Sequence, residues 1–348
     1  MRVKASHSLH EFDLIRAIHR RYGRSDRSLV RGIGDDAAVV VQSPQRWSLL
    51  TTDLLAESVH FDLNTATFMD VGFRAAAANL SDIAAMGGAP RYLLVALAIP
   101  RRGTDRQVHE LYRGMMAACR PHGVRLIGGD LSASSSGWFI AITLLGSVPP
   151  HRALFRRGAR AGDRLYVTGT LGDSLAGLKL LRQEKSSRKR RTARHSLSPG
   201  HRRFLIGRHL RPSARVGIGQ WLSNKRLATS AIDLSDGLSG DVRHICDESR
   251  VGAEIDLMAL PVSAACRTFA DRTGADPSTL AVTGGEDFEL LFTTPPRLHV
   301  ELERQAAQRG FRVTCIGTIR PARDGIKARL KTGALQPLAA ASYEHFQG

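Results

Sequence analysis

The chain has 348 residues, a hydrophobic fraction of 43% and a formal net charge of +18. That apolar fraction is sufficient for packed cores and excludes a disordered chain, and the length suits two α/β domains of ordinary size. The four cysteines form no C-x-x-C pair, which argues against a disulfide framework and a structural zinc site. The most apolar runs, residues 92–99 and 138–145, are too short to span a bilayer, and the first residues lead into an amphipathic helix instead of an apolar signal core. We therefore expect a cytoplasmic protein.

Much of the positive charge lies in one segment. Residues 185–203 contain eight Lys or Arg residues and no acidic residue. Such a run is typical of a solvated surface loop, and we predict a basic insert over residues 184–203. A basic chain can also bind nucleic acid, but no RNA-recognition signature, zinc-finger spacing or aromatic platform accompanies this run. We therefore expect neither a nucleic-acid partner nor a membrane partner.

The first half of the chain predicts a domain over residues 1–150. Phe12, Ile15 and Ile18 recur at helical spacing and predict an amphipathic helix. Apolar runs bounded by turn residues predict strands, and alanine-rich or amphipathic segments predict helices. The expected strands are 37–41, 47–50, 92–99, 124–127 and 139–145, and the expected helices are 70–86 and 107–120. The pair Pro149-Pro150 marks the end of this domain.

The second half predicts a domain over residues 151–348 with the same alternation. The expected strands are 164–168, 228–234, 288–292 and 312–319, and the expected helices are 171–181, 240–249 and 298–309. Repeated alternation of strands and helices in both halves indicates an α/β fold, or α+β layers.

Acidic residues recur beside glycine or at apparent strand ends. Any one of these strings alone is more typical of an Asx-turn or a helix cap. A buried carboxylate, however, is costly unless it is paired or bound to a metal, and oxygen-only ligands select hard cations, above all Mg²⁺. The strings are Gly32-Ile33-Gly34-Asp35-Asp36, Thr51-Thr52-Asp53, Asn79-Leu80-Ser81-Asp82, Gly128-Gly129-Asp130, Asp233-Leu234-Ser235-Asp236 and Gly284-Gly285-Glu286-Asp287.

Magnesium at protein sites usually arrives with substrate phosphates. The sequence contains no G-x-x-x-x-G-K-[ST] and neither the H-R-D nor the D-F-G string of protein kinases. The glycine pairs could allow backbone N–H groups to approach phosphate oxygens, although most such pairs mark only turns. The residues alone therefore indicate a magnesium–phosphate enzyme with a non-Walker site.

Taken in order, these strings resemble those of thiamine-monophosphate kinases, a family in the superfamily of aminoimidazole ribonucleotide synthetase and selenophosphate synthetase. Val59-His60-Phe61 and Tyr166-Val167-Thr168-Gly169 also match, and the resemblance runs from Glu11 to Phe346. It implies an N-terminal domain that forms a shared β-barrel in a homodimer and a C-terminal α/β domain that covers the ATP cleft. It also implies thiamine diphosphate biosynthesis, by Mg²⁺-dependent in-line transfer of the γ-phosphoryl group of ATP to thiamine monophosphate. An aspartyl-phosphate intermediate stays an alternative to direct transfer.

The resemblance also implies roles for individual residues. The implied magnesium ligands are Asp36, Thr51, Thr52, Asp53, Asp82, Asp130, Asp233 and Asp236. The implied nucleotide contacts are Tyr112, Gly129, Arg156 and Ser235, with Arg157 as an alternative to Arg156. The implied thiamine-phosphate contacts are His60, Glu286 and Tyr343. The chain departs from the family pattern at Ser58, Phe73 and Phe288 and in the basic insert, and no implied ligand is lost.

Two rival functions remain open on the sequence. Another member of the superfamily would use ATP to activate a different acceptor. A selenophosphate synthetase should carry a reactive cysteine in an early glycine-rich loop, whereas the first cysteine here is Cys119. A nucleic-acid-binding protein would instead use the net charge.

Overall fold

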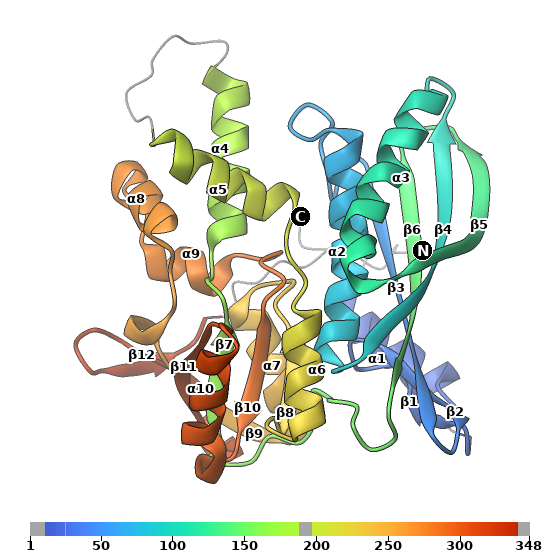
Figure 1. The fold of residues 1–348 in the computed structure, drawn as a ribbon. Helices are drawn as coiled ribbons and strands as arrows, with labels where there is room; N and C mark the ends of the chain where they lie inside the picture. Colours follow the sequence, from blue (N-terminus) through green and yellow to red (C-terminus); the bar gives the residue numbers. More distant parts are fainter. Residues whose placement is uncertain (1–10, 25, 188–196, 340–348) are drawn as a thin grey trace, which may run out of the picture.

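The computed structural model describes residues 11–24, 26–187 and 197–339, and the strands of these residues form two sheets, one of six strands and one of seven. Figure 1 shows the two sheets on opposite sides of helix α2 (Phe68–Ala85). No helix of the described residues is long and apolar enough to cross a membrane.

The first sheet has the strand order β1-β2-β3-β6-β4-β5. All neighbouring strands are antiparallel except β4 and β5, which are parallel. The strand order does not return on itself, so these strands form an open sheet and not a closed barrel. The strands are β1 (Leu29–Arg31), β2 (Ala38–Ser43), β3 (Arg46–Ala56), β4 (Ala89–Pro100), β5 (Arg125–Ser134) and β6 (Phe139–Val148).

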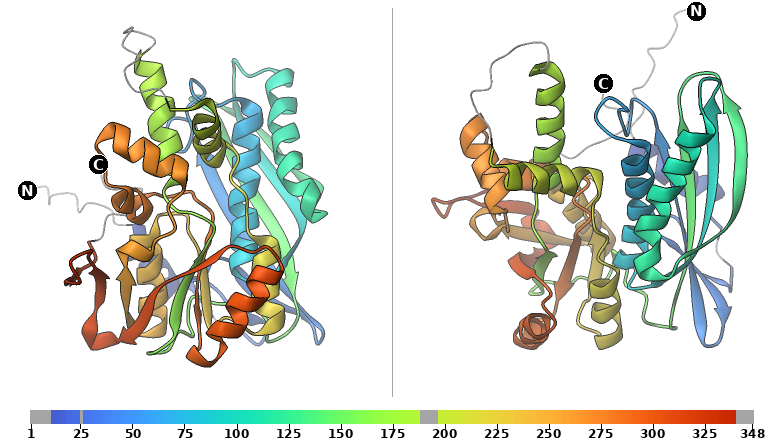
Figure 2. Two further views of the ribbon diagram at one scale, coloured as in Figure 1. Left: turned by 60° about the vertical axis from the view of Figure 1, so that its left-hand side comes forward. Right: turned by 45° about the horizontal axis from the view of Figure 1, so that its top comes forward.

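Helices α2 and α3 (Asp105–Cys119) pack together over one face of the first sheet (Figure 2). Glycines let the two helix backbones come close: a Cβ at Gly72 would lie 2.0 Å from the Leu111 carbonyl oxygen, and one at Gly114 would lie 2.0 Å from that of Met69. Helix α2 begins at a capping box in which Thr67 and Asp70 satisfy each other's backbone N–H groups. Its position is therefore fixed at its first turn and along its length.

The opposite face of the first sheet has no helix over it among the described residues. Leu50, Leu54 and Tyr92 lie on that face, and their exposed fractions are 36%, 56% and 45%. Leu50 of β3 and Tyr92 of β4 both pair with Leu145 of β6, which lies between them, and Leu54 of β3 pairs with Ala141 of β6. We call this surface the open face.

The second sheet has the order β13-β12-β9-β11-β7-β10-β8 and is antiparallel except between β9 and β12. Successive side chains of its central strands point to opposite faces of the sheet and so pack into two different hydrophobic cores. Tyr166 and Phe292 face the core that contains α6, whereas Val167 and Leu291 face the core that contains α7. The strands are β7 (Arg164–Thr168), β8 (Ser230–Asp233), β9 (Val251–Asp256), β10 (Leu290–Thr294), β11 (Val313–Pro321), β12 (Ile326–Arg329) and β13 (Leu335–Pro337).

The remaining helices surround the second sheet, apart from α1, which precedes the first sheet in the chain. They are α1 (Glu11–Tyr22), α4 (Asp173–Ser187), α5 (Pro199–Leu210), α6 (Val216–Lys225), α7 (Leu238–Ser249), α8 (Ala264–Thr273), α9 (Pro277–Thr283) and α10 (His299–Gln308). Short 3₁₀ turns lie at Arg120–His122, Leu257–Ala259, Pro296–Leu298 and Ala322–Asp324.

The predicted mixture of α/β layers is confirmed, with one sheet in each half of the chain. The two halves are nevertheless in close contact, because a Cβ at Gly219 of α6 would lie 1.9 Å from the carbonyl oxygen of Ala84 in α2. The residues of α6 share one core with those of α2. The boundary between residues 150 and 151 stays a prediction. Of the predicted basic insert, residues 184–187 form the end of α4 and residues 199–203 form the start of α5, so these parts are helical and not loop. Residues 188–196 lie outside the described residues.

Candidate functional site

Three carboxylates from three separate elements meet between the two sheets. Asp36 lies in the loop before β2, Asp82 in α2 and Asp233 at the end of β8, and each offers an oxygen within 4.8 Å of the others. The hydroxyl of Thr51 in β3 donates a hydrogen bond to Asp82. Asp53 follows two residues later in β3, so it lies on the same face of the sheet as Thr51, and one of its carboxylate oxygens is buried. We call Asp36, Asp53, Asp82 and Asp233 the acidic cluster.

The acidic cluster lacks enough protein partners for its charge. One buried oxygen of each of Asp36, Asp53 and Asp233 has no hydrogen-bond partner among the described residues. Burial, followed by the Asp36 carboxylate, raises the pKa of Asp233 to about 8. Burial and then Asp236 raise the pKa of Asp53 to about 6, and burial with neighbouring carboxylates raises the pKa of Asp82. Orphaned anionic oxygens of this kind fit a bound hard cation.

One cation of the protein already reaches the cluster. The guanidinium of Arg156 lies 2.6 Å from Asp36 Oδ1, and the backbone N–H of Arg156 donates to Asp35 at 3.0 Å. The neighbouring Arg157 instead lies over the ring of Phe155, 5.4 Å from its centroid. The geometry therefore favours Arg156 over Arg157 as the arginine that faces the site.

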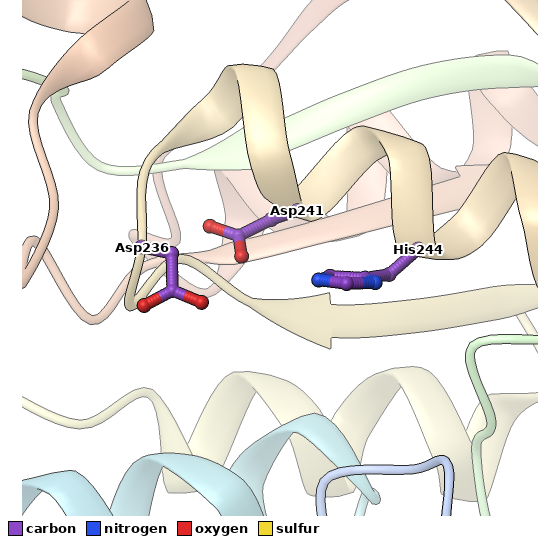
Figure 3. A group of neighbouring side chains, drawn as sticks. All are labelled: Asp236, Asp241 and His244. Atoms are coloured by element: carbon purple, nitrogen blue, oxygen red, sulfur yellow. The ribbon is translucent and has the colours of Figure 1, made fainter. Parts of the chain in front are cut away.

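A second group of possible ligands lies at the start of α7 (Figure 3). Asp236, Asp241 and His244 offer ligand atoms within 4.8 Å of one another. Burial, then Arg156, lowers the pKa of His244 to about 4, so its ring is neutral and able to bind a metal. Sequence reasoning found Asp236 but missed the other two. The spacing of Asp241 and His244, three residues apart on a helix, was the available signal.

Ser235 lies between these two groups, in the turn from β8 into α7. Its hydroxyl is 3.5 Å from Asp233 Oδ1, and its carbonyl accepts from the backbone N–H of Glu286 at 2.7 Å. Ser235 therefore connects the acidic cluster with the loop that carries Glu286.

Two of the predicted metal ligands lie apart from the acidic cluster. Asp130 does not follow a strand end, as its glycine pair had suggested, but lies within the edge strand β5. The two glycines, Gly128 and Gly129, continue the strand because Gly129 packs directly against β4. A Cβ at Gly129 would lie 1.8 Å from the carbonyl oxygen of Val95. Asp130 is in register with Ala96, and through β4 and β6 with Leu54, so it lies on the open face.

Thr52 shares the open face because it alternates with Thr51 and Asp53 along β3. Strands β6 and β4 separate β3 from β5, so Asp130 lies three strand spacings, roughly 14 Å, from β3. Asp53 itself lies within β3 and not at its end, because the strand continues to Ala56. The chain thus brings six of the eight predicted magnesium ligands to the space between the sheets and leaves two on the open face.

The predicted nucleotide contacts Tyr112 and Gly129 belong to the first half of the chain, where Tyr112 lies in α3 and Gly129 in β5. Together with Gly128, Asp130 and two leucines they line a hollow of about 630 Å³ between α3 and β5. Burial raises the pKa of the Tyr112 hydroxyl, so that group is a neutral hydrogen-bond donor or acceptor. The four predicted nucleotide contacts therefore lie in two places. Tyr112 and Gly129 line the hollow beside β5, whereas Ser235 and Arg156 lie near the acidic cluster.

The predicted acceptor contacts His60 and Glu286 come together through an arginine. Arg74 of α2 donates to the carbonyl oxygen of His60 and lies 2.8 Å from Glu286 Oε1. His60 Nδ1 accepts from the backbone N–H of Ala56 at 3.0 Å, which leaves Nε2 as the nitrogen that carries the proton of a neutral ring. Tyr343 lies outside the described residues.

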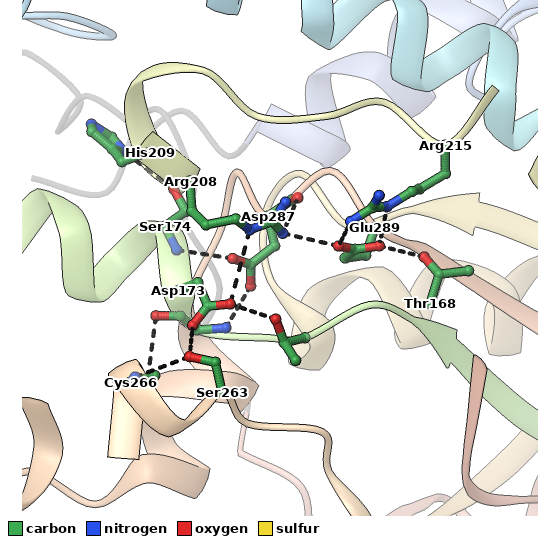
Figure 4. Close-up of polar contacts among 12 residues, drawn as sticks. Thr168, Asp173, Ser174, Arg208, His209, Arg215, Ser263, Cys266, Asp287 and Glu289 are labelled. Carbon is green, nitrogen blue, oxygen red and sulfur yellow. Dashed lines mark hydrogen bonds and ion pairs between the residues drawn. The ribbon is translucent and has the colours of Figure 1, made fainter. Parts of the chain in front are cut away.

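A buried ionic network supports the loop that carries Glu286 (Figure 4). The carboxylate of Glu289 is fully buried and pairs with Arg208 at 2.9 Å and with Arg215. The carboxylate of Asp287 accepts backbone N–H bonds from Gly172 and Ser174 at the start of α4. Removing one partner of such buried pairs is costly, so the network holds the loop in place.

The backbone of that loop is unusual. Glu286 has φ +60° and Phe288 has φ +50°, both in the left-handed region that side chains other than glycine rarely adopt. Hydrogen bonds from these two residues to Ser235 and Leu234 hold the loop in that conformation. A non-glycine residue held in this region is often found at a functional site, and here it directs Glu286 toward Arg74.

Comparison with known proteins agrees with this architecture. The model of the N-terminal domain of AIR synthase related proteins matches residues 34–148, and the model of the C-terminal domain matches residues 160–327. The fold and the buried acidic site therefore define a two-domain protein of the AIR synthase related class.

Individual relatives narrow this class. The chain is 38% identical to a thiamine-monophosphate kinase of Haemophilus influenzae over 89% of both chains. It is 37% identical to that of Escherichia coli over 97% of this chain and 98% of the relative. A solved structure, AaThiL complexed with AMPPCP and TMP, matches with a TM-score of 0.82 and 33% identity over 99% of both chains. The chain belongs to the thiamine-monophosphate kinase family.

Proposed function

We propose that this protein transfers the γ-phosphoryl group of ATP to thiamine monophosphate and so forms thiamine diphosphate. The observation that carries the proposal is the acidic cluster, whose orphaned oxygens lie between two sheets in a chain of this family. The relative of matching fold is complexed with AMPPCP, a non-hydrolysable analogue of ATP, and with TMP. The names of the relatives argue against the rival acceptors of the superfamily.

The donor set fits Mg²⁺. The oxygens of Asp36, Asp82 and Asp233 converge within 4.8 Å, and Asp53 and Thr51 lie beside them. Asp236 offers a further carboxylate at the start of α7. Magnesium bound there would neutralise phosphate charge and lower the barrier to phosphoryl transfer. Because binding requires ionised carboxylates, metal affinity is expected to rise with pH.

The residues of the chain supply position and charge, and no strong general base is needed. The acceptor is itself a phosphate, with roughly −1.5 to −2 charge at neutral pH, so it is already a nucleophile. Arg156 brings positive charge to the cluster, and Ser235 links it to the Glu286 loop. His60 and Glu286 are the proposed contacts of the thiamine moiety, together with Tyr343. Transfer is proposed to be direct and in line.

A stereochemical test separates direct transfer from an aspartyl-phosphate intermediate. One in-line transfer inverts the configuration of a chiral γ-phosphoryl group, whereas two successive transfers retain it. Inversion is expected. Retention would show that the phosphoryl group passes through the enzyme.

The active form is proposed to be a homodimer in which two open faces meet and complete a barrel. The open face carries exposed Leu54 and Tyr92, which water contacts in the single chain. It also carries Thr52 and Asp130, the two predicted magnesium ligands that lie away from the acidic cluster. In a dimer of this kind these two side chains and the hollow beside Tyr112 would face the second copy, which would explain their separation from the cluster.

The proposal is tested by a coupled assay of ADP formation with a panel of candidate acceptors. Thiamine monophosphate is expected to stimulate ADP release, while thiamine, aminoimidazole ribonucleotide precursors and selenide are not. Stimulation by another acceptor, with none by thiamine monophosphate, would assign the protein to a different activity of the superfamily.

A further inference from the structure

We propose that Arg74 is a positioning residue of the acceptor site, which fixes the carboxylate of Glu286 and the main chain of His60 relative to each other. This inference rests on the proposed function, since it assigns a task within the site for thiamine monophosphate. No predicted ligand of the metal or of the nucleotide is involved.

The contacts of Arg74 join three elements and two loops. One nitrogen of the guanidinium, Nη2, reaches both the His60 carbonyl and Glu286 Oε1, the latter at 2.8 Å. The other, Nη1, lies 3.4 Å from Nε2 of His209 in α5. His209 Nδ1 in turn lies 3.1 Å from the hydroxyl of Ser174 in α4 and 3.5 Å from Glu286 Oε2. The planar guanidinium holds its donors in a fixed, spread arrangement, which a single lysine ammonium does not reproduce.

Burial makes these contacts obligatory. The Arg74 side chain is 7% exposed, whereas Glu286 is 32% exposed and is therefore reachable by a ligand. A buried guanidinium is stable only when it is paired, so the Arg74 cation must keep its carboxylate partner. The buried Arg74 therefore lies behind Glu286, and the Glu286 carboxylate lies at the surface of the site.

Helix α2 also relates the acceptor contacts to the acidic cluster. Arg74 and Asp82 lie eight residues apart in this helix, which corresponds to about 12 Å along its axis. The capping box at Thr67 and the close contacts with α3 and α6 fix this helix. Arg74 therefore sets the thiamine contacts at a constant distance from the carboxylates that face the phosphates.

The charges around Glu286 define its ionisation. The partial burial of Glu286 raises the pKa of its carboxyl group, and the charge and hydrogen bond of Arg74 oppose that rise. Burial lowers the pKa of His209 to about 3, with contributions from Arg74 and Arg182, so this neighbour is neutral. Arg208 faces the same loop but pairs with Glu289 and the Asp287 carbonyl. Arg74 is therefore the cation that keeps Glu286 ionised.

The test compares Arg74→Gln and Arg74→Lys with the wild-type enzyme in steady-state kinetics from pH 6 to pH 9. For Arg74→Gln, the KM for thiamine monophosphate is expected to rise about ten-fold or more, while the KM for ATP stays within about two-fold. Without the guanidinium the pKa of Glu286 rises, so the acid limb of kcat/KM for thiamine monophosphate should move to higher pH. Arg74→Lys keeps the charge but not the fork, and should restore the pH profile without restoring the full affinity.

Arg211→Gln is the matched control. Arg211 also joins the end of α5 to α2, but its guanidinium pairs with Asp70 at 2.7 Å and not with Glu286 or His60. Its KM values and pH profile should equal those of the wild type. Thermal melts are recorded for every variant, and if Arg74→Gln does not fold, Arg74→Lys carries the test through its raised KM.

The outcomes separate the two levels of the proposal. A wild-type enzyme that ignores thiamine monophosphate would overturn the proposed function and this inference with it. An active wild type together with folded Arg74 variants whose KM for thiamine monophosphate is unchanged would overturn the inference alone. Equal loss of kcat at every pH, with both KM values unchanged, would show that Arg74 is only structural.

Discussion

At the scale of single residues, the acidic cluster opposes the stability of the chain that contains it. Its carboxylates are buried, mutually repulsive and incompletely hydrogen-bonded. Burial of like charges costs free energy of folding unless a cation compensates for it. The protein therefore retains a strained electrostatic site whose compensation comes from the proposed Mg²⁺ and, in part, from Arg156.

Asp53→Asn and Asp82→Asn are each predicted to reduce kcat by roughly 100-fold or more, because each removes a charge proposed to hold magnesium against phosphate. The same changes should raise the melting temperature measured without Mg²⁺, because they relieve repulsion in the cluster. Calorimetric melts with and without Mg²⁺ and steady-state rates provide the measurement.

Asp271→Asn is the control for these two variants, because Asp271 is an exposed carboxylate in α8, away from the cluster. It should change neither the rate nor the effect of Mg²⁺ on the melt. Normal turnover of Asp53→Asn at low Mg²⁺ would remove this residue from the proposed metal site.

His209 predicts a pH dependence of stability. Burial, then Arg74, lowers the pKa of His209 from 6.5 to about 3. The unfolded chain takes up a proton below pH about 6.5 and the folded chain does not, so stability is lost as pH falls from about 6.5 toward about 3. The loss from this one residue approaches about 1.4 kcal/mol per pH unit.

Urea unfolding of the wild type and of His209→Gln between pH 7.5 and pH 5 checks this prediction. The wild type should lose stability more steeply, and the difference between the two curves should widen as the pH falls. Parallel curves would show that His209 does not titrate as the structure indicates.

At the scale of elements, the strands and helices of the second half were predicted only in part, and strands β9, β12 and β13 were missed. Strand β7 has the predicted bounds 164–168, because a short apolar run between turn residues has few other interpretations. Helices α5 and α6 were not predicted, since their glycines and basic residues hide the helical period and their stability comes from packing on α4 and α2.

The candidate site was predictable as a set of residues but not as an arrangement. Each acidic string is visible in the sequence, whereas the meeting of Asp36, Asp82 and Asp233 depends on how the second sheet packs on α2. The role of Arg74 could not be predicted, because an arginine in an alanine-rich helix gives no sign of the loops that it contacts. Asp130 was placed at a strand end because its glycines indicated a turn, when they instead allow close strand pairing.

The basic insert provides a prediction at the element scale. Replacing residues 186–194 by a short Gly/Ser linker should leave kcat and both KM values within about two-fold of the wild type, because the proposed site uses none of these residues. Any binding of nucleic acid should weaken and lose its steep dependence on salt. A large loss of kinase activity in the deletion variant would show that the insert belongs to the site.

At the scale of the whole molecule, the open face predicts the oligomeric state. Leu54→Asp places a charge in the centre of the proposed apolar interface, so the variant should be monomeric by light scattering and largely inactive, whereas the wild type should be dimeric. Val300→Asp is the matched control, because Val300 is 65% exposed on α10 and lies on the second sheet side. A wild-type monomer, or a fully dimeric Leu54→Asp, would contradict the proposed dimer.

This chain is proposed to make thiamine diphosphate from thiamine monophosphate and ATP, with Mg²⁺ held by the acidic cluster. The most direct measurement quantifies ADP and thiamine diphosphate together in a single turnover, with Mg²⁺ and with EDTA. We expect one thiamine diphosphate for each ADP with Mg²⁺ and neither product with EDTA. Release of ADP without thiamine diphosphate, or equal formation of both products in EDTA, would contradict it.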